Sequence, residues 1–245
     1  MDIREDETLE ELQLCGFRLI QKKNSFRFGV DAVLLADFAR IRQTDSAADF
    51  GTGSGILPLL LLGRNKGQMI HALEINGEMA ELAERNMLLN GVEKKVQVLH
   101  ADARRASAVI HPGSIDAIVC NPPYGVPGRH PASENARLAE ARHQQKNALS
   151  DLLKAAYCIL RGRGRISIIY PADQMLDLMV ALRAHDLEPK RFRLVYPYAS
   201  SAARLVLVEG VKSARPTLQP QPPLILYEPD GRYTDELKSI YHMRE

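Results

Sequence analysis

Residues 49–55 carry the sequence Asp-Phe-Gly-Thr-Gly-Ser-Gly, and this stretch decides how the rest of the chain is interpreted. It follows a short apolar run at 47–50 and precedes an apolar helical pattern at 56–62. Glycine lets a backbone turn sharply and approach a ligand closely, where a Cβ atom would collide. Ligands of open α/β sheets bind at the carboxyl ends of strands. The sequence therefore predicts a ligand-binding loop between a strand and a helix.

The chemistry of this loop narrows the choice of ligand. Its GxGxG spacing differs from the dinucleotide pattern GxGxxG, and it lacks the Gly-Lys-Ser/Thr of a P-loop. The carboxylate of Asp49 repels a phosphate but suits the ammonium of an amino acid. This combination favours S-adenosylmethionine (AdoMet) over NAD or ATP. A tight turn without a ligand remains the alternative for a glycine triplet taken alone.

The rest of the chain alternates between strand and helix patterns, which is typical of a sheet covered on both faces. We expect strands at 47–50, 69–73, 96–99, 115–120, 165–170, 192–196 and 205–208, and helices at 56–62, 78–90, 148–160 and 172–185. The connection at 197–203 is too short for a parallel crossover, so the last two strands should be antiparallel. The prediction is a doubly wound α/β fold of the Rossmann-like kind. Its seven-stranded sheet is mostly parallel, with one antiparallel strand near the C-terminus.

Two acidic residues follow the next strands. Glu74 ends the second expected strand, where an acidic side chain can accept hydrogen bonds from both hydroxyls of a ribose. Asp102, with Ala103 beside it, follows the third strand and can accept a hydrogen bond from an adenine amino group. For either residue an N-cap is the structural alternative.

The most specific motif is Asn121-Pro122-Pro123-Tyr124, directly after the expected strand at 115–120. The prolines remove two backbone donors and hold the segment extended. The Asn121 side chain and the Pro122 carbonyl can then both accept from one NH₂ group. This pairing favours a more tetrahedral amine nitrogen, whose lone pair is otherwise delocalised into a ring or amide. Tyr124 offers a ring for stacking on a planar substrate.

Length and composition limit the organisation of the chain. Its 245 residues, 45% of them hydrophobic, suit one domain: a segment at 1–45 that covers the cofactor, a catalytic core at 46–210 and an extension at 211–245. No apolar run is long enough for a membrane span, and the acidic start is unlike a signal peptide. Three cysteines without a CxxC pair favour buried, reduced thiols in a cytoplasmic protein. We expect neither a metal nor a membrane partner.

Charge divides unevenly along the chain. Residues 1–120 carry 14 Lys/Arg against 17 Asp/Glu, whereas residues 121–245 carry 18 against 13. A basic second half suits a nucleic acid, although a solvated surface explains it equally well. Residues 125–147 are polar and lack apolar periodicity, which predicts a substrate lid or a loop without a role. Arg129, Arg142 and His143 are the residues in it that we expect to contact RNA.

Residues 26–210 resemble the class I AdoMet-dependent methyltransferases, and Asn121 to Tyr124 resemble the motif of their amino-group branch. Within that branch the chain is similar to the bacterial tRNA1(Val) (adenine-37-N6) methyltransferase family. The segments that carry this closer match are 28–36 (FGVDAVLLA), 141–143 (ARH), 222–224 (PPL) and 233–234 (YT).

The resemblance implies a role for each motif. Asp49, Gly51 and Gly53 would hold the methionine part of AdoMet, and the segment with Phe28 and Asp31 would close over the cofactor. Asn121, Pro122, Pro123 and Tyr124 would act on an adenine of a tRNA. The full set expected to bind AdoMet is Phe28, Asp31, Asp49, Gly51, Gly53, Gly55, Glu74, Asp102, Ala103 and Asn121.

Two other functions stay open at this point. A glutamine methyltransferase of release factors would use the same four residues, but those enzymes carry a sizeable helical domain ahead of the glycine loop. Here 48 residues precede Asp49, and residues 28–36 already resemble the cofactor cover. A non-catalytic RNA-binding protein of the same fold is the second alternative, and the intact Asp49 and Asn121 argue against it.

Overall fold

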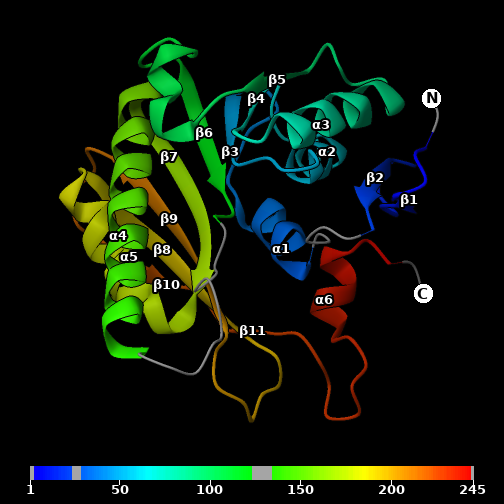
Figure 1. Ribbon diagram of the computed structural model, residues 1–245. Helices are drawn as coiled ribbons and strands as arrows, with labels where there is room; N and C mark the ends of the chain where they lie inside the picture. The colour runs from blue at the N-terminus through cyan, green and yellow to red at the C-terminus, as the bar shows by residue number, and fades with distance from the viewer. Residues whose placement is uncertain (1–2, 24–28, 123–133, 244–245) are drawn as a thin grey trace.

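The fold is built on one large sheet, seen edge-on at the centre of Figure 1. In the computed structural model the described residues are 3–23, 29–122 and 134–243, and within 134–146 only the backbone is described. The strands of the main sheet are β3 (Ser46–Phe50), β4 (Met69–Glu74), β5 (Val96–His100), β6 (Ile115–Cys120), β7 (Leu160–Pro171), β8 (Leu187–Tyr196), β9 (Leu205–Lys212), β10 (Gln219–Pro220) and β11 (Leu224–Ile225). Their order is β10-β8-β9-β7-β6-β3-β4-β5, with β11 also on β8.

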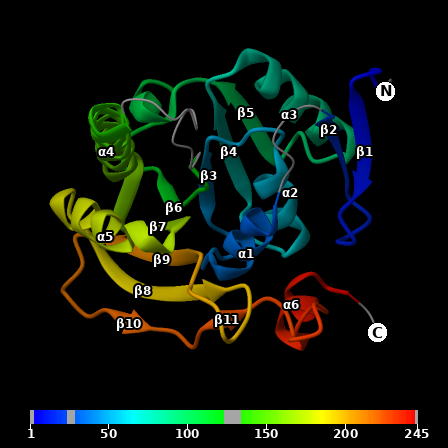
Figure 2. The same ribbon diagram turned by 60° about the horizontal axis from the view of Figure 1, so that its bottom comes forward.

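The direction of the strands agrees with the sequence. Strands β3 to β7 pair in parallel, and β9 is antiparallel to both β7 and β8. The expected mostly parallel sheet with one reversed strand is thereby confirmed. The expected number of seven strands was too low, because β10 and β11 add two short strands beside β8 (Figure 2). Both lie in or next to a proline-rich segment, and a sheet edge is one of the few places where a strand tolerates proline.

Helices cover both faces of the sheet (Figure 1). One face packs on α1 (Val30–Phe38), α2 (Ile56–Gly63) and α3 (Gly77–Leu89), and the C-terminal α6 (Asp235–Ile240) closes beside α1. The other face packs on α4 (Glu134–Ile159), α5 (Met175–Ala184) and the 3-10 turn η1 (Ala103–Ala108). A second 3-10 turn, η2 (Ala172–Gln174), leads from β7 into α5. Burial of apolar side chains on both faces of the parallel strands explains their nearly continuous hydrophobic runs.

A two-stranded hairpin, β1 (Glu7–Glu11) and β2 (Arg18–Lys22), precedes α1 and lies against α3. Glu7, which is almost fully buried, forms an ion pair with Arg85 of α3 at 2.5 Å. This pair lowers the pKa of Glu7, chiefly through the hydrogen bond from Arg85. The hairpin is thus held by this ion pair together with the buried side chains of Leu19 and Ile20.

Two expectations about local structure were wrong. Residues 134–147, expected to be lid or loop, form the first turns of α4. This stretch is rich in Ala, Arg, Glu and Gln, which favour helix even where no apolar stripe exists. The three cysteines are free, as expected, but only Cys120 is buried, whereas Cys15 in a hairpin turn and Cys158 on α4 are exposed. Among the described residues, no helix has the length and apolar character needed to cross a membrane.

Candidate active site

A cavity of about 610 Å³ opens at the carboxyl ends of five neighbouring strands. Each strand end contributes to its wall: Phe50 and Gly51 after β3, Leu73 and Ile75 at β4, Ala101 to Arg104 after β5, Cys120 and Pro122 at β6, and Tyr170 and Pro171 at β7. The remaining wall comes from α4 and η2. This is the place and the size expected of a small-molecule site in an α/β sheet.

The glycine loop takes backbone conformations that favour glycine. Gly51, Gly53 and Gly55 have φ angles of 79°, 56° and 85°. A Cβ atom on Gly51 or Gly53 would meet no heavy atom within 4 Å, so the space above these two residues is open. A Cβ on Gly55 would lie 2.7 Å from the Met87 side chain. Gly55 therefore serves the close packing of α2 against α3, whereas Gly51 lines the cavity.

The loop is anchored from behind by Asn86, a fully buried residue of α3. Its amide nitrogen donates to the carbonyl of Ser54 at 2.8 Å and to the carbonyl of Ile20 at 2.9 Å. Its oxygen accepts from the N–H of Ile20 at 2.7 Å. One side chain thus joins the loop to strand β2 and satisfies the backbone of both.

Glu74 reaches the same loop from the end of β4. Its carboxylate accepts from the backbone N–H of Gly53 at 2.9 Å and from that of Asn76 at 2.8 Å. Glu74 is buried and is not among the residues that line the cavity. A carboxylate has about four lone-pair sites, so two of them remain for other donors. The structure places Glu74 beside the loop as expected and adds a role in holding it.

Asp49 is fully buried at the end of β3. Burial raises the pKa of Asp49 to about 7, the neighbouring Thr52 hydroxyl opposes the rise, and the charge of Glu74 adds to it. Neither carboxylate oxygen of Asp49, nor Oγ1 of Thr52, has a hydrogen-bond partner of standard geometry among the described residues. A buried carboxylate without partners is costly. It is the feature of this site that most clearly calls for a cationic ligand group.

Asp102 has partners of its own. It caps η1 by accepting from the N–H of Arg104 at 2.9 Å, and it forms an ion pair with the Arg104 guanidinium at 2.7 Å. The hydrogen bond from Arg104 lowers the pKa of Asp102. Asp102 therefore has the N-cap role that the sequence offered as the structural alternative. Asp102, Ala103 and Arg104 all line the cavity, so a ligand there would also meet this turn.

The Asn121-Pro122 turn begins where β6 ends. Both residues are half-buried, and Pro122 lines the cavity. Cys120 before them is buried, with its thiol directed at the carbonyl of Phe50 at 3.5 Å. Burial raises the pKa of this thiol far above its usual range, so it stays neutral and unreactive. Asn121 and Pro122 thus lie at the carboxyl end of β6, with Pro122 in the cavity wall and the neutral Cys120 thiol directly before them.

Several residues of the site were missed from the sequence. Ile75 lines the cavity with 60% of its surface exposed, which is unusual for a large apolar side chain at a strand end. Tyr170 lines it at the end of β7, and burial raises the pKa of its hydroxyl. Leu149 and Leu152 of α4 complete the apolar wall. The position of Ile75 and Tyr170 at the ends of predicted strands was the available signal.

The remaining expected residues fall into three groups. Phe28, Pro123, Tyr124 and Arg129 lie outside the described residues. Arg142 and His143 lie on α4, where only the backbone is described. Asp31 stands in the first turn of α1 and is not among the residues that line the cavity, and burial raises its pKa.

Comparison with known proteins gives the following similarities. Residues 29–184 match the family model described as Methyltransferase small domain. The tRNA1(Val) (adenine(37)-N6)-methyltransferase of Aliivibrio salmonicida is 27% identical over 213 residues, which are 86% of this chain and 88% of that protein. A predicted O-methyltransferase from Agrobacterium tumefaciens superimposes with a TM-score of 0.69 at 23% identity, covering 86% of this chain and 95% of the other. The AdoMet complex of TYW2 from M. jannaschii gives a TM-score of 0.57 at 14% identity, covering 86% and 88%. At these identities the two structures show a shared fold.

Proposed function

Because the chain belongs to the Methyltransferase small domain family and is an AdoMet-dependent methyltransferase, we propose that it methylates the exocyclic N6 of an adenine in tRNA. The observation that carries the proposal is the position of Asn121 and Pro122 at the carboxyl end of β6, where Pro122 lines the strand-end cavity. The relatives named tRNA1(Val) (adenine(37)-N6)-methyltransferase match most of this chain, which supports position 37 of tRNA1(Val) as the target. Such a substrate would place the protein in the cytoplasm.

The residues that line the cavity, and the buried residues beside it, fit AdoMet. Asp49, buried without a partner, suits the methionine ammonium, and the open space over Gly51 and Gly53 accepts the methionine backbone. Glu74 retains lone pairs for the ribose hydroxyls. The apolar face of Ile75 and the turn at Asp102 suit the adenine ring and its amino group. AdoMet supplies, when bound, a methyl group activated by a sulfonium.

The Asn121-Pro122 turn would act on the amine that receives the methyl group. The Asn121 side-chain oxygen and the Pro122 carbonyl each accept one hydrogen of the NH₂ group. Their pull favours a tetrahedral nitrogen whose lone pair points away from the acceptors. Positioning of this kind supplies most of the acceleration, and no general base is needed before attack. The proton leaves to water after transfer.

The target base must reach this turn. An adenine inside a stack cannot, so it is either flipped out or already exposed in a loop of the RNA. We propose that Tyr124 stacks on the extruded base and that Arg129, Arg142 and His143 contact the RNA around it. The apolar wall of Leu149 and Leu152 lies on the helix that carries Arg142, which would link RNA contact to the cavity.

The proposal is tested by nucleoside mass spectrometry of tRNA from cells with and without the gene. Loss of N6-methyladenosine from one tRNA in the deletion strain, with recovery on complementation, is the expected result. A release-factor glutamine methyltransferase would instead leave every tRNA nucleoside unchanged and remove the methyl group from a release factor. A non-catalytic protein would change neither.

A further inference from the structure

A second cavity, of about 550 Å³, lies on the face of the sheet that packs on α1. It shares no lining residue with the cavity at the strand ends. Its wall is formed by the end of α1, by β8 and by the C-terminal segment that includes α6. Four of its lining residues are cations, Arg40, Lys66, Arg191 and Arg193. We refer to it as the arginine cavity.

Arg191 is a buried cation with incomplete hydrogen bonding. Only 7% of the residue is exposed, and its guanidinium lies 3.8 Å from the centre of the Phe38 ring. Nη2 donates to the carbonyl of Phe38 and to Glu209. Nε has no partner among the described residues. A buried arginine normally satisfies most of its five N–H donors, so this one lacks an acceptor.

The cations around the cavity repel one another. Lys66 gives its three ammonium protons to the carbonyls of Ala36, Asp37 and Ala39, which end α1. Burial lowers the pKa of Lys66 to about 8, Asp37 opposes this, and the charges of Arg64 and Arg191 lower it further. Burial lowers the pKa of Arg191, the hydrogen bond and charge of Glu209 oppose this, and the charges of Arg40 and Arg165 lower it further. An anion placed among these groups would relieve the repulsion.

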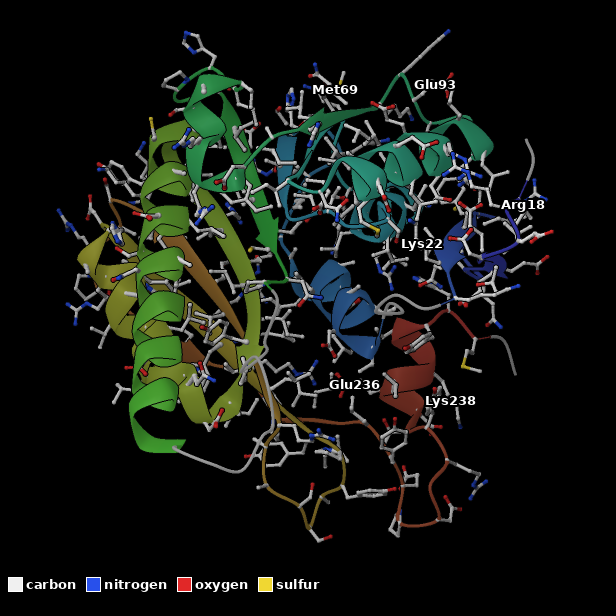
Figure 3. The ribbon with its side chains drawn as sticks, in the orientation of Figure 1. Arg18, Lys22, Met69, Glu93, Glu236 and Lys238 are labelled. Atoms are coloured by element: carbon white, nitrogen blue, oxygen red, sulfur yellow. The ribbon has the colours of Figure 1, made fainter. Side chains whose placement is uncertain are left out.

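The carboxylates nearby are already engaged. Glu236 of α6 points toward the sheet and bonds Arg193 at 2.6 Å, while Lys238 lies on the other side of the same helix (Figure 3). Glu209 bonds Arg191, and Asp37 acts on Lys66. Four cations against these three carboxylates leave one positive charge in excess.

Some N–H donors of the arginine residues in this cavity have no acceptor among the described residues. Arg40 makes no hydrogen bond or ion pair with any described residue. Arg193 uses Nε and Nη2 for Pro222, Pro223 and Glu236, and its Nη1 has no hydrogen-bond partner in the described part of the chain. Guanidinium groups match the oxygens of phosphate with paired N–H donors.

We propose that the arginine cavity binds a phosphate group, held by Arg40, Arg193 and the inner Arg191. Arg191 and Arg193 are two residues apart on β8 and Arg40 lies just beyond the end of α1, so all three line the same cavity. The phosphate belongs either to the backbone of a bound RNA or to a free phosphate-bearing molecule. Binding of an RNA phosphate rests on the proposed function, whereas binding of a free phosphate-bearing molecule does not.

Two binding measurements test this, with inorganic phosphate and with an unmodified tRNA transcript as probes. The variants are Arg40→Gln and Arg193→Gln, and the matched control is Lys238→Gln, which removes one charge on the far side of α6. Arg40 is exposed, so its variant should fold. Arg40→Gln should weaken phosphate binding by about tenfold, as expected for one lost charge-assisted hydrogen bond, and Lys238→Gln should not.

The tRNA measurement identifies the source. If the phosphate is part of RNA, Arg40→Gln also weakens tRNA binding and makes the plot of log affinity against log salt shallower by about 0.9. If it is free, tRNA affinity is unchanged while phosphate binding is lost. If neither probe distinguishes Arg40→Gln from Lys238→Gln, the site does not exist. A protein that failed to bind tRNA at all would contradict the proposed function and leave the phosphate measurement to decide.

Discussion

The carboxylate of Glu74 accepts a hydrogen bond from the backbone N–H of Gly53 at 2.9 Å. Glu74, which is proposed to bind the ribose, therefore also holds the glycine loop, which is proposed to bind the methionine part of AdoMet. Because Asn86 holds the same loop from α3, two side chains set its shape before any ligand arrives. Such preorganisation lowers the entropic cost of binding.

Replacing Glu74 should disturb both roles. Glu74→Ala should weaken AdoMet binding by about 1–3 kcal/mol, the range for lost charge-assisted hydrogen bonds, and should speed hydrogen exchange at the Gly53 amide. Titration calorimetry and exchange mass spectrometry measure the two effects. Glu78→Ala, which removes an exposed carboxylate paired with Lys22, is the control and should change neither. Unchanged AdoMet affinity in Glu74→Ala would remove Glu74 from the site.

Asp49 gives the site a pH dependence. Its folded pKa of about 7 lies above its unfolded value of about 3.9, so its contribution to stability is fully present below pH ~4 and is lost as pH rises through 7. Without cofactor, Asp49→Asn should therefore be more stable than the native protein at pH 8, by about 1–3 kcal/mol. Urea unfolding of both proteins across this range measures the difference. A constant difference at every pH would contradict the assignment.

The same substitution should harm cofactor binding. The native protein should bind AdoMet more tightly as pH rises from 6 to 8, because Asp49 becomes charged in the free protein. Asp49→Asn should lack this rise and bind more weakly at pH 8. At pH 8, Asp49→Asn would then raise the stability of the protein and weaken its binding of AdoMet. This opposition is expected when a destabilising residue is kept for function.

Asn86 and Asn90 form a natural pair for separating fold from function. Both bond the backbone N–H and C=O of a β2 residue, Asn86 at Ile20 and Asn90 at Arg18, but only Asn86 reaches the loop at Ser54. Asn86→Ala should cost about 2–4 kcal/mol of stability, because it leaves buried backbone groups unpaired, and should also weaken AdoMet binding. Asn90→Ala should lower stability less and leave AdoMet binding unchanged. If Asn86→Ala and Asn90→Ala changed AdoMet affinity equally, the shape of the loop would not depend on Asn86.

Arg142 tests the contact between α4 and RNA. Arg142→Ala should weaken tRNA binding more than AdoMet binding, and should make the salt dependence of tRNA affinity shallower by about 0.9 as one phosphate contact is lost. Lys154→Ala is the control, since this exposed residue lies on the same helix about 18 Å further along its axis. If Arg142→Ala behaves like Lys154→Ala, Arg142 does not contact RNA.

The sheet was predictable from the sequence because its central strands are buried on both faces and stand out as short apolar runs. Strand β6, for example, was predicted at its observed bounds. The hairpin β1-β2 and the edge strands β10 and β11 were not predictable in this way. The hairpin combines the ion pair of Glu7 and Arg85 with burial of the adjacent Leu19 and Ile20, and each edge strand has only two residues, so neither leaves a periodic pattern.

Of the residues expected from the motifs, Gly51, Asp102, Ala103 and Pro122 line the cavity, and their roles toward AdoMet stay predictions. They were identifiable because glycine, aspartate and proline are unusual at strand ends. Ile75 and Tyr170 are ordinary residues that line the cavity only because the sheet brings five strand ends together. The buried, unpartnered state of Asp49 also depends on tertiary packing, and no single stretch of sequence encodes it.

Asn121 is the residue on which the proposed chemistry depends. Its hydrogen bond to the target amine should strengthen as the nitrogen becomes tetrahedral, so it should act on turnover more than on binding. Asn121→Ala should lower kcat by a factor of about 10²–10³ while AdoMet affinity stays nearly constant. Tyr124→Phe should be mild, because stacking needs the ring, whereas Tyr124→Ala should cost about 1–3 kcal/mol.

The most direct measurement is single-turnover methylation of an unmodified tRNA transcript by the native protein and by Asn121→Ala, with nucleoside analysis of the product and AdoMet titration of both proteins. The native protein should produce N6-methyladenosine, and the variant should produce the same nucleoside about 10²–10³ times more slowly at unchanged AdoMet affinity. A fully active Asn121→Ala protein would contradict the proposed mechanism. A methylated nucleoside other than N6-methyladenosine would contradict the proposed target atom.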